Sequence, residues 1–181
     1  MRPVLRLFLL LIPFFPAMAT EQAFPPTAPG VAEFKTLPAG MLLKTTAQGS
    51  YFDQSGQLFR PLFSYISTHQ IAMTTPVEAK IDGAAMYFWV AASEQPKVAG
   101  NAAGVEVIRI PERRVASLGV RGAYTRANFE QARGELLAWL AHQPGMEAAG
   151  EPYAVYWNSP FTLWFVKQSE VHVPVHPRPT P

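Results

Sequence analysis

The sequence predicts an α+β fold built from two copies of one strand–helix–strand–strand unit. Short runs of β-branched and aromatic residues alternate with stretches in which apolar residues recur at helical spacing. The two halves of the chain also resemble each other, which is typical of an internal repeat. With 181 residues, the chain suits one such domain with short terminal segments. We expect the two copies at about residues 37–93 and 110–169.

The repeat is clearest where each copy begins. At an offset of 73 residues, Pro38 corresponds to Pro111 and Gly49 to Gly122. Later in each copy the offset is 76, and a loop between helix and strand can absorb the difference. This second alignment places Trp89 opposite the aromatic residues of the second copy. It predicts that aromatic residues of both copies lie on buried strands near the axis that relates them.

Six strands are predicted from these patterns. Most are apolar runs bounded by glycine, proline or other turn residues. The last one is followed by prolines, so we expect it at an edge of the sheet. The predicted strands cover residues 41–47, 85–92, 105–110, 115–121, 161–166 and 171–175.

Two helices are predicted between the strands, each with one apolar face. Thr125 is the expected N-cap of the second helix, because its hydroxyl can accept an unpaired backbone N–H. In the first helix Pro61 predicts either a kink or a helix that begins only one turn before this proline, because proline lacks the N–H that a helix interior needs. The predicted faces consist of Leu58, Phe59, Leu62, Phe63 and Ile66 in the first helix and of Phe129, Ala132, Leu136, Leu137 and Leu140 in the second.

The first nineteen residues have the pattern of a secretory signal peptide. Arg2 and Arg6 precede an apolar run over residues 7–15, and Ala17-Met18-Ala19 fits a cleavage site. The apolar run is too short to span a bilayer, so we expect no stable membrane anchor after cleavage. We therefore expect a periplasmic or secreted protein. Its mature chain has a flexible, proline-rich segment over residues 20–30, a domain over 31–175 and a proline-rich tail over 176–181.

Charge and composition exclude several classes of function. The chain has 15 basic and 13 acidic residues, and removal of Arg2 and Arg6 with the signal peptide leaves 13 of each. A neutral mature chain gives no reason to expect binding to nucleic acid. The absence of cysteine excludes disulfides, thiolate catalysis and cysteine metal sites. We expect a monomer that is held together by its hydrophobic core.

Four segments resemble the SOUL haem-binding family. The segment Gln-Ile-Ala-Met-Thr-Thr-Pro-Val at 70–77 resembles the family segment after the first helix, with Gln70 in place of lysine. Arg-Val-Ala at 114–116 resembles the start of the second copy, and Tyr-Trp-Asn-Ser-Pro-Phe at 156–161 resembles the family's turn. Glu-Val-His-Val at 170–173 resembles its closing strand. The resemblance covers roughly residues 31–175.

This resemblance implies a distorted antiparallel barrel or sheet with two helices packed outside, related by a pseudo-twofold axis. It also implies a binding module for haem or another tetrapyrrole. The fold is similar to that of bacterial effector-binding domains, which hold hydrophobic ligands in a cleft between the repeats. Because one fold serves many functions, the function follows less directly than the fold.

The first helix and the segment after it supply the candidate haem cleft. Phe59 and Phe63 lie four residues apart, and Arg60 can meet a propionate. His69 is a candidate axial ligand, although a solvated loop histidine explains it as well. Met73 can ligate iron through its thioether or fill the core. The two phenylalanines can instead face the sheet. No cluster of histidines and carboxylates with the spacing of a metal site is present in the sequence.

The leading hypothesis is an exported protein that binds haem or a related tetrapyrrole in an apolar cleft and has no catalysis of its own. Alternatives are a binder of other hydrophobic small molecules, a hydrolase or tetrapyrrole-modifying enzyme that uses a cleft carboxylate, and a structural envelope protein. Candidate carboxylates are Glu78, Glu151 and Glu170. A Gly-x-Ser-x-Gly motif and a phosphate-binding glycine loop are absent from the sequence. Arg113 and Arg114 are expected in a solvated turn before a strand.

Overall fold

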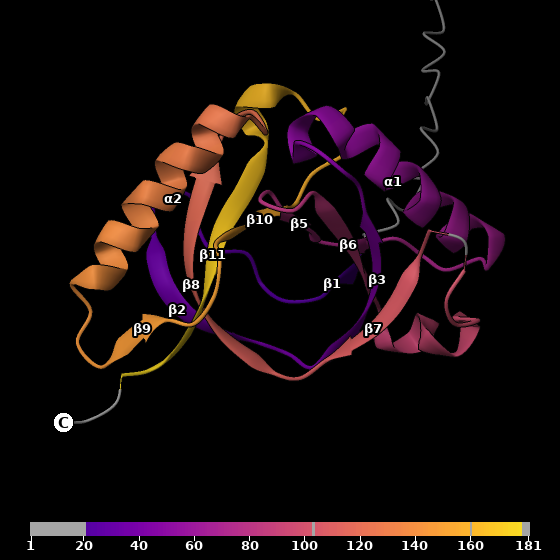
Figure 1. Ribbon diagram of the computed structural model, residues 1–181, viewed down its shortest axis with the longest axis horizontal. Coiled ribbons are helices and arrows are strands. Elements are labelled where there is room, and N and C mark those ends of the chain that lie inside the picture. Colours follow the sequence, from indigo (N-terminus) through magenta and orange to yellow (C-terminus); the bar gives the residue numbers. More distant parts are fainter. Residues whose placement is uncertain (1–20, 103, 160, 179–181) are drawn as a thin grey trace, which may run out of the picture.

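A computed structural model describes residues 21–102, 104–159 and 161–178. The chain forms one curled antiparallel sheet, and helices pack alongside it (Figure 1). The sheet does not close into a full barrel, because β2 and β7 at its two ends do not pair with each other. It is a half-barrel with an inner and an outer face. The predicted α+β class with a distorted antiparallel sheet is therefore confirmed.

The order of strands across the sheet is β2-β8-β11-β10-β5-β6-β3-β7. β9 (Met146–Ala148) pairs with the end of β11, and β1 (Glu21–Gln22) forms a separate parallel pair with β4 (Thr74–Thr75). The main strands are β2 (Ala32–Leu37), β3 (Gly40–Thr46), β5 (Val77–Lys80), β6 (Ala85–Val90), β7 (Glu106–Ile110), β8 (Arg113–Arg121), β10 (Tyr153–Tyr156) and β11 (Gln168–Pro177).

Two helices cover the outer face of the sheet (Figure 1). α1 (Tyr51–Thr68) packs on β3 and β6, and α2 (Arg126–Ala141) packs on β8, β9 and β11. Pro61 lies inside α1, which begins at Tyr51, so the alternative that the helix begins only one turn before this proline is wrong. Thr125 caps α2 as predicted, because its Oγ1 accepts the backbone N–H of Asn128 at 3.2 Å.

The predicted apolar faces of these helices are only partly buried. Leu58, Leu62 and Ile66 of α1 lie in the core, whereas Phe63 is half exposed. Leu137 of α2 is also exposed. The outer cluster therefore leaves aromatic surface on α1 uncovered.

The two faces of the sheet carry separate apolar clusters, because successive strand residues point to opposite faces. The outer cluster lies between the sheet and both helices. The inner cluster lies inside the curl and is shared by strands from both halves of the chain. It consists of Phe24, Leu37, Leu42, Ala85, Tyr87, Trp89, Val115, Tyr153, Val155 and Trp157.

Two predictions about strands are wrong. Residues 161–166 do not form a strand: Trp164–Val166 is a short 3-10 helix in a loop, and Phe161 is 96% exposed. The strand after this loop, β11, is not at an edge but lies between β8 and β10. An apolar run can serve as exposed surface as well as core, and periodicity alone does not separate the two.

The order of the elements agrees with an internal repeat but does not test whether the two copies have the same structure. The order strand, helix, strand, strand occurs as β3-α1-β5-β6 and again as β8-α2-β10-β11, with β4 before β5 and β9 before β10. The aromatic residues at 164–165 nevertheless do not lie beside Trp89, because they are exposed in the loop. The pseudo-twofold relation and the domain boundaries stay predictions.

The signal-peptide prediction for residues 1–19 lies outside the described residues. In the described part of the chain, no helix is long and apolar enough to cross a membrane. Residues 21–30, predicted to be flexible, lie against the inner face of the sheet (Figure 1).

Candidate ligand site

The structure brings three of the predicted site residues together on the outer side of α1. The rings of Phe59 and Phe63 stack with centroids 5.5 Å apart and an interplanar angle of 17°. Phe59 is half-buried and also contacts Phe88 of the sheet, whereas Phe63 is 50% exposed. Arg60 is exposed and lies three residues before Phe63, so both side chains project from the same side of the helix. This cluster is an aromatic surface beside a cation rather than a closed cleft.

The other two predicted residues lie at the far end of α1. The imidazole of His69 packs on the Tyr65 ring at 4.3 Å, and its Nδ1 lies 2.9 Å from the Tyr65 carbonyl oxygen. Nδ1–H therefore donates to this carbonyl, and only Nε2 is oriented for another partner. Met73 is half-buried and packs against the outer cluster, which is the core-filling role.

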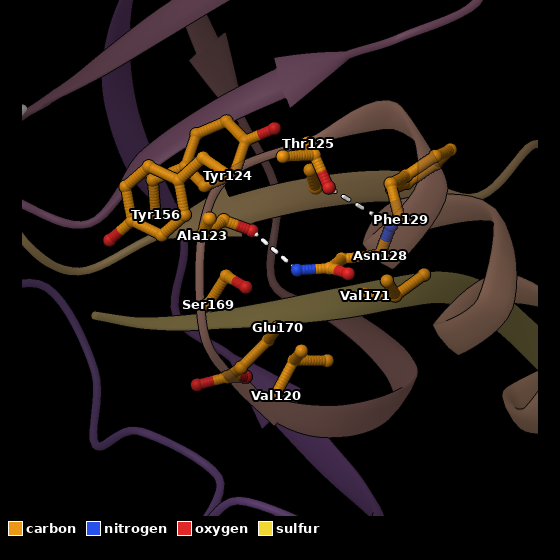
Figure 2. Close-up of a pocket in the computed structure, with 11 residues that line it drawn as sticks. Val120, Ala123, Tyr124, Thr125, Asn128, Phe129, Tyr156, Ser169, Glu170 and Val171 are labelled. Atoms are coloured by element: carbon orange, nitrogen blue, oxygen red, sulfur yellow. Dashed lines mark hydrogen bonds between the residues drawn. The ribbon is translucent and has the colours of Figure 1, made fainter. Parts of the chain in front are cut away.

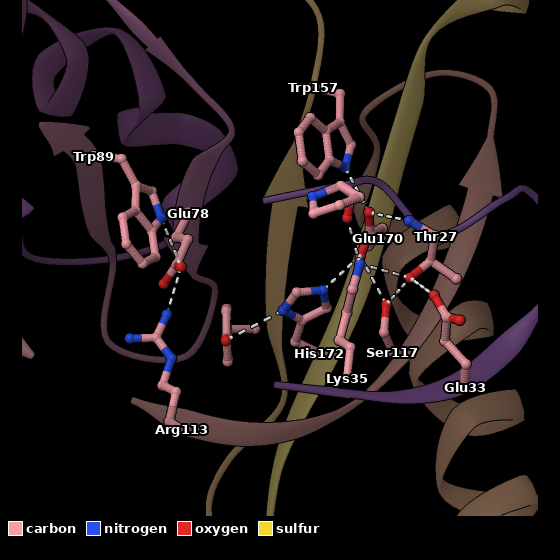
Figure 3. A network of polar contacts seen from close by, with 12 residues as sticks. Thr27, Glu33, Lys35, Glu78, Trp89, Arg113, Ser117, Trp157, Glu170 and His172 are labelled. Atoms are coloured by element: carbon pink, nitrogen blue, oxygen red, sulfur yellow. Dashed lines mark hydrogen bonds and ion pairs between the residues drawn. The ribbon is translucent and has the colours of Figure 1, made fainter. Parts of the chain in front are cut away.

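A second, more elaborate site lies on the inner face of the sheet around Glu170 (Figure 3). Its carboxylate is fully buried and accepts hydrogen bonds at both oxygens. Oε1 accepts the indole N–H of Trp157 and the backbone N–H of Thr27, both at 2.7 Å. Oε2 accepts the hydroxyl of Ser117 at 2.7 Å. This set of donors stabilises an ionised carboxylate away from water.

Two further groups contact Oε2 of Glu170. His172 Nε2 lies 2.6 Å from it, and Lys35 Nζ lies 3.2 Å from it. The Lys35 ammonium also donates to the carbonyl of Pro25 at 2.8 Å and to Oγ1 of Thr27 at 2.9 Å. Its three N–H groups thus have three acceptors, and two of these acceptors belong to the N-terminal segment.

A second carboxylate, Glu78, lies across the inner face from Glu170 (Figure 3). Its Oε1 accepts the indole N–H of Trp89 at 2.9 Å and forms an ion pair with Arg113. The Arg113 guanidinium also lies over the rings of Trp89 and Tyr153, at 5.7 and 5.8 Å from their centroids. The two sites share one design, a buried glutamate that is bound by a tryptophan and a cation.

Burial, hydrogen bonds and neighbouring charges together set the protonation states of this network. Burial raises the pKa of Glu170, but the hydrogen bonds and charges of His172, Ser117 and Lys35 outweigh it, so the pKa lies below its ordinary value. The pKa of His172 is lowered, because burial disfavours its charged form more than Glu170 favours it. Burial raises the pKa of Tyr153. At neutral pH the site thus holds an ionised Glu170, a neutral His172 and a neutral Tyr153.

Phe24 fills the space between the two glutamate sites. Its ring meets Trp89 and Trp157 edge-on, with centroids 5.6 and 5.4 Å apart. The His172 ring lies at 5.9 Å, and the Lys35 ammonium at 5.4 Å from the Phe24 centroid. Phe24 is only 5% exposed, although Pro25 and Pro26 beside it are exposed. It belongs to the N-terminal segment, not to the sheet, and it completes the inner cluster.

Outside these contacts, one small cavity lies where β8, β10 and β11 meet the start of α2 (Figure 2). Tyr124 and Tyr156 form one wall with ring centroids 4.3 Å apart. Its volume of about 10 Å³ accommodates a water and no larger ligand. A wider depression of about 300 Å³ lies beside the end of β3, with Lys44 and Glu106 among the residues that line it. These two residues form an exposed ion pair at 2.8 Å.

Neither buried glutamate of the inner face is unpaired. Glu78 and Glu170 are each bound by a cation and by a tryptophan indole N–H. Among the described residues, no three histidine or acidic side chains gather in a way that could hold a metal ion. Glu151, the third candidate carboxylate, is exposed.

Sequence reasoning identified only parts of this inner site. The sequence predicts Glu78 and Glu170 as candidate carboxylates but gives no signal for Phe24 or Lys35. The prediction that Arg113 lies in a solvated turn is wrong, because Arg113 begins β8 and its half-buried side chain pairs with Glu78. One signal was available: Glu170 and His172 alternate with valines in β11, and period-two alternation places both on one face. Which aromatic residue lies between them depends on long-range contacts that no local pattern encodes.

The comparison with protein families decides where this chain belongs. Residues 25–174 match the model described as SOUL heme-binding protein, which is most of the chain. The chain belongs to the SOUL haem-binding family. The matched region includes α1, both glutamate sites of the inner face and the exposed loop over residues 161–166, and it begins directly after Phe24.

Solved structures of the same fold come from several kinds of protein. The C-terminal domain of EcmrR has a TM-score of 0.63 and 15% identity, with 81% of this chain and 97% of that chain covered. A structure of EcmrR bound to DNA has a TM-score of 0.65 and 13% identity and covers 81% of this chain, but only 57% of the length of the EcmrR chain is spanned. A structure described as a hydrolase from Listeria innocua has a TM-score of 0.56 and 13% identity, with 82% and 94% covered. At these identities the likeness shows the fold alone. The search of curated proteins finds no match.

Proposed function

We propose that this protein is exported and binds haem or a related tetrapyrrole without covalent attachment and without catalysis of its own. The SOUL family supports this class of ligand. Export rests on the signal-peptide pattern of residues 1–19. The observation that carries the proposed site is the stacked pair of Phe59 and Phe63 beside the exposed Arg60.

This aromatic pair offers a flat macrocycle a surface that is already exposed. Full burial of one apolar side chain contributes about 1.5–3 kcal/mol, and a micromolar Kd corresponds to about 8 kcal/mol. Before the free-energy cost of association is subtracted, a few such contacts and one cation for a propionate reach this magnitude. Binding on an open surface also agrees with the small volume of the cavity beside Tyr124.

Axial ligation of iron is not required for this mode of binding. His69 keeps its ring on Tyr65 and uses Nδ1 for the Tyr65 carbonyl, so only Nε2 is oriented to reach an iron. We therefore propose that apolar contact with Phe63 contributes more affinity than ligation by His69. A tetrapyrrole without metal should then bind almost as tightly as haem.

A haemin titration of the mature chain from Thr20 onward tests the proposal. The Soret band and tryptophan fluorescence should change saturably, with one haemin per chain at micromolar concentration. Phe63→Ala and Arg60→Ala should each weaken binding roughly tenfold, as expected for loss of one apolar contact or one charge-assisted contact. Leu137→Ala on α2 is the matched control, because Leu137 is also an exposed apolar residue of a helix.

The outcomes separate the function from the site. An unsaturable response, like that of an unrelated protein, would remove haem as the ligand. Saturable binding that is insensitive to Phe63→Ala but weakened by Trp164→Ala would move the site to the exposed loop over residues 161–166, where Trp164 is 66% exposed. Equal weakening by Leu137→Ala would indicate non-specific apolar adsorption.

A further inference from the structure

The N-terminal segment 21–30 lies on the inner face in the way that a bound peptide lies in a groove. Its contacts run largely through the backbone: the N–H of Ala23 donates to the carbonyl of Thr75 at 2.7 Å. Lys35 binds the carbonyl of Pro25, and the N–H of Thr27 donates to Glu170. Recognition of main-chain groups with one pocket for a side chain is the usual mode for extended peptides.

The spacing of the buried side chains fits an extended, proline-rich conformation. Phe24 and Thr27 are buried, whereas Pro25 and Pro26 between them are exposed. A polyproline II helix repeats every three residues, so positions 24 and 27 face the same side. The two prolines carry no N–H, and the segment therefore presents fewer donors that need partners.

The sheet is shaped to receive this segment. A side chain at Gly119 would collide with the backbone of Thr27 and Ala28, so glycine permits the close approach. On the other side of the slot, Nε of Arg113 is buried and has no hydrogen-bond partner. The two buried carboxylates are each paired with a cation, Glu170 with Lys35 and Glu78 with Arg113, and Glu33 at the edge of the site accepts the hydroxyl of Thr27 at 2.7 Å. The site therefore suits a neutral ligand that offers hydrogen-bond acceptors.

We propose that the inner face is a binding site for an extended peptide with an aromatic residue, and that the chain's own segment 21–30 occupies this site as a displaceable plug. The aromatic side chain of the ligand enters the slot between Trp89 and Trp157. In the places of Pro25 and Thr27, one main-chain carbonyl of the peptide accepts a hydrogen bond from Lys35 and one main-chain N–H donates to Glu170. This site is separate from the outer surface of α1 and does not depend on haem binding.

A tethered plug competes strongly with any free peptide. A short tether gives the plug an effective concentration of about millimolar at its own site. A free peptide at lower concentration displaces the plug only if it has a higher affinity for the site or if the plug is weakened. Phe24→Ala weakens the plug at its anchor and leaves the groove of the sheet unchanged. The probe is the peptide acetyl-Ala-Phe-Pro-Pro-Thr-amide, which copies residues 23–27.

The expected result is saturable binding of this peptide to the Phe24→Ala chain, followed by tryptophan fluorescence. The peptide with alanine in place of phenylalanine should bind at least roughly tenfold more weakly, because it lacks the ring that fills the slot. The Phe34→Ala chain is the matched control. Phe34 also packs against a tryptophan, with its ring 5.0 Å from Trp139, but it is only half-buried and lies on the outer face.

A disulfide lock tests displacement within one protein. Gln22 and Thr75 are paired in the parallel β1–β4 register, and neighbouring strands lie about 4.8 Å apart, which is within the Cα separation that a disulfide spans. The chain has no cysteine of its own, which leaves this disulfide as the only one. Phe24→Ala with the oxidised lock should not bind the peptide, and reduction should restore binding. Binding that is equal in both redox states would overturn the proposal.

Hydrogen exchange of the unmodified chain decides the matter if Phe24→Ala fails to fold. A displaceable plug opens without global unfolding, so the amide of Thr27 should exchange at least about a hundredfold faster than the amide of Val171 in β11. Exchange of both amides at the rate of global unfolding would show that the segment is ordinary core. Equal binding of the phenylalanine and alanine peptides would equally overturn the proposal.

Discussion

His172 and Glu170 share a hydrogen bond of 2.6 Å between Nε2 and Oε2, and both side chains are fully buried. On its other nitrogen, Nδ1 of His172 lies 3.2 Å from the hydroxyl of Tyr153. Because burial keeps both His172 and Tyr153 neutral, Tyr153 donates to Nδ1 and Nε2–H donates to Glu170. The pair fixes the direction of a hydrogen-bond chain that runs from β10 to the centre of the inner site.

Replacement of Glu170 by glutamine should be strongly destabilising. The amide removes the negative charge that Lys35 faces and presents an NH₂ group to donors that need an acceptor. Breaking a buried ion pair in this way costs about 3–5 kcal/mol. Urea unfolding measures the change in the free energy of unfolding.

The matched control for this variant is Glu106→Gln. Glu106 forms an exposed ion pair with Lys44, and such pairs contribute less than about 1 kcal/mol. If both variants lose the same small free energy, the network around Glu170 does not stabilise the fold.

Gly119→Ala should displace the N-terminal segment and leave the sheet folded. The new Cβ would collide with backbone atoms of Thr27 and Ala28, which cannot give way as a flexible side chain can. Thr27 should then lose its hydrogen bond to Glu170, and its amide should exchange faster. Circular dichroism should show an unchanged sheet, whereas fluorescence of Trp89 and Trp157 should change.

Gly134→Ala is the control for the effect of alanine itself. Gly134 lies inside α2, and a Cβ there would meet nothing within 4 Å. This substitution should stabilise the protein by about 0.5–1 kcal/mol, since glycine is unfavourable in a helix. An unchanged Thr27 amide in Gly119→Ala would contradict the close packing described for the segment.

Most elements of this fold could be predicted because their signals are local. The helical spacing of Leu136 and Leu140 and the cap at Thr125 are read within one turn of the chain. The run Phe161–Val166 shows the limit of such signals. Its composition suits a buried strand, but tertiary context leaves Phe161 almost fully exposed.

The inner site required information that lies far apart in the sequence. Glu170 is bound by Thr27, which is 143 residues away, and by Ser117, which is 53 residues away. Alternation within β11 predicts that Glu170 and His172 lie on one face of the strand. Which residues of other strands lie beside them depends on the register of strand pairing, and the position of Phe24 depends on its tertiary contacts. The resemblance to the SOUL family points to α1, whereas the site around Glu170 is assembled from residues of β2, β8 and β11, from Trp157 directly after β10 and from the N-terminal segment.

The caps of the two helices should differ in their contribution to stability. Thr125 accepts the N–H of Asn128, so Thr125→Ala should lower the free energy of unfolding by about 1 kcal/mol. Ser50 is the N-cap of α1 but makes no capping hydrogen bond with its side chain. Its Oγ instead accepts a hydrogen bond from the exposed side chain of Arg126 at 2.6 Å. Because this contact is exposed to water, Ser50→Ala should cost less than about 0.5 kcal/mol. Urea unfolding of the two variants at one pH checks the order, and equal losses would contradict the difference in geometry.

His69→Ala should change haemin affinity less than Phe63→Ala does. The Nδ1–H of His69 donates to the Tyr65 carbonyl, and its ring lies on Tyr65 rather than at the stacked pair of Phe59 and Phe63. A titration followed by the Soret band should show a shift below threefold for His69→Ala. Loss of the Soret shift with His69→Ala, at unchanged protein stability, would instead identify His69 as an iron ligand.

The stability of the protein should fall in two steps as the pH is lowered. His172 has a folded-state pKa below its ordinary value of 6.5, so the unfolded chain binds more protons below that pH and stability decreases. Glu170 has a folded-state pKa below its ordinary value of 4.5, so the stability it contributes is present above 4.5 and is lost as the pH falls further.

Urea unfolding at pH 7.5, 5.5 and 4.0 separates these contributions. The His172→Gln chain keeps a side-chain donor for Glu170 but does not titrate, so its stability should change less between pH 7.5 and 5.5 than that of the unmodified chain. A profile that is the same with and without His172 would show that this histidine is not buried in its neutral form.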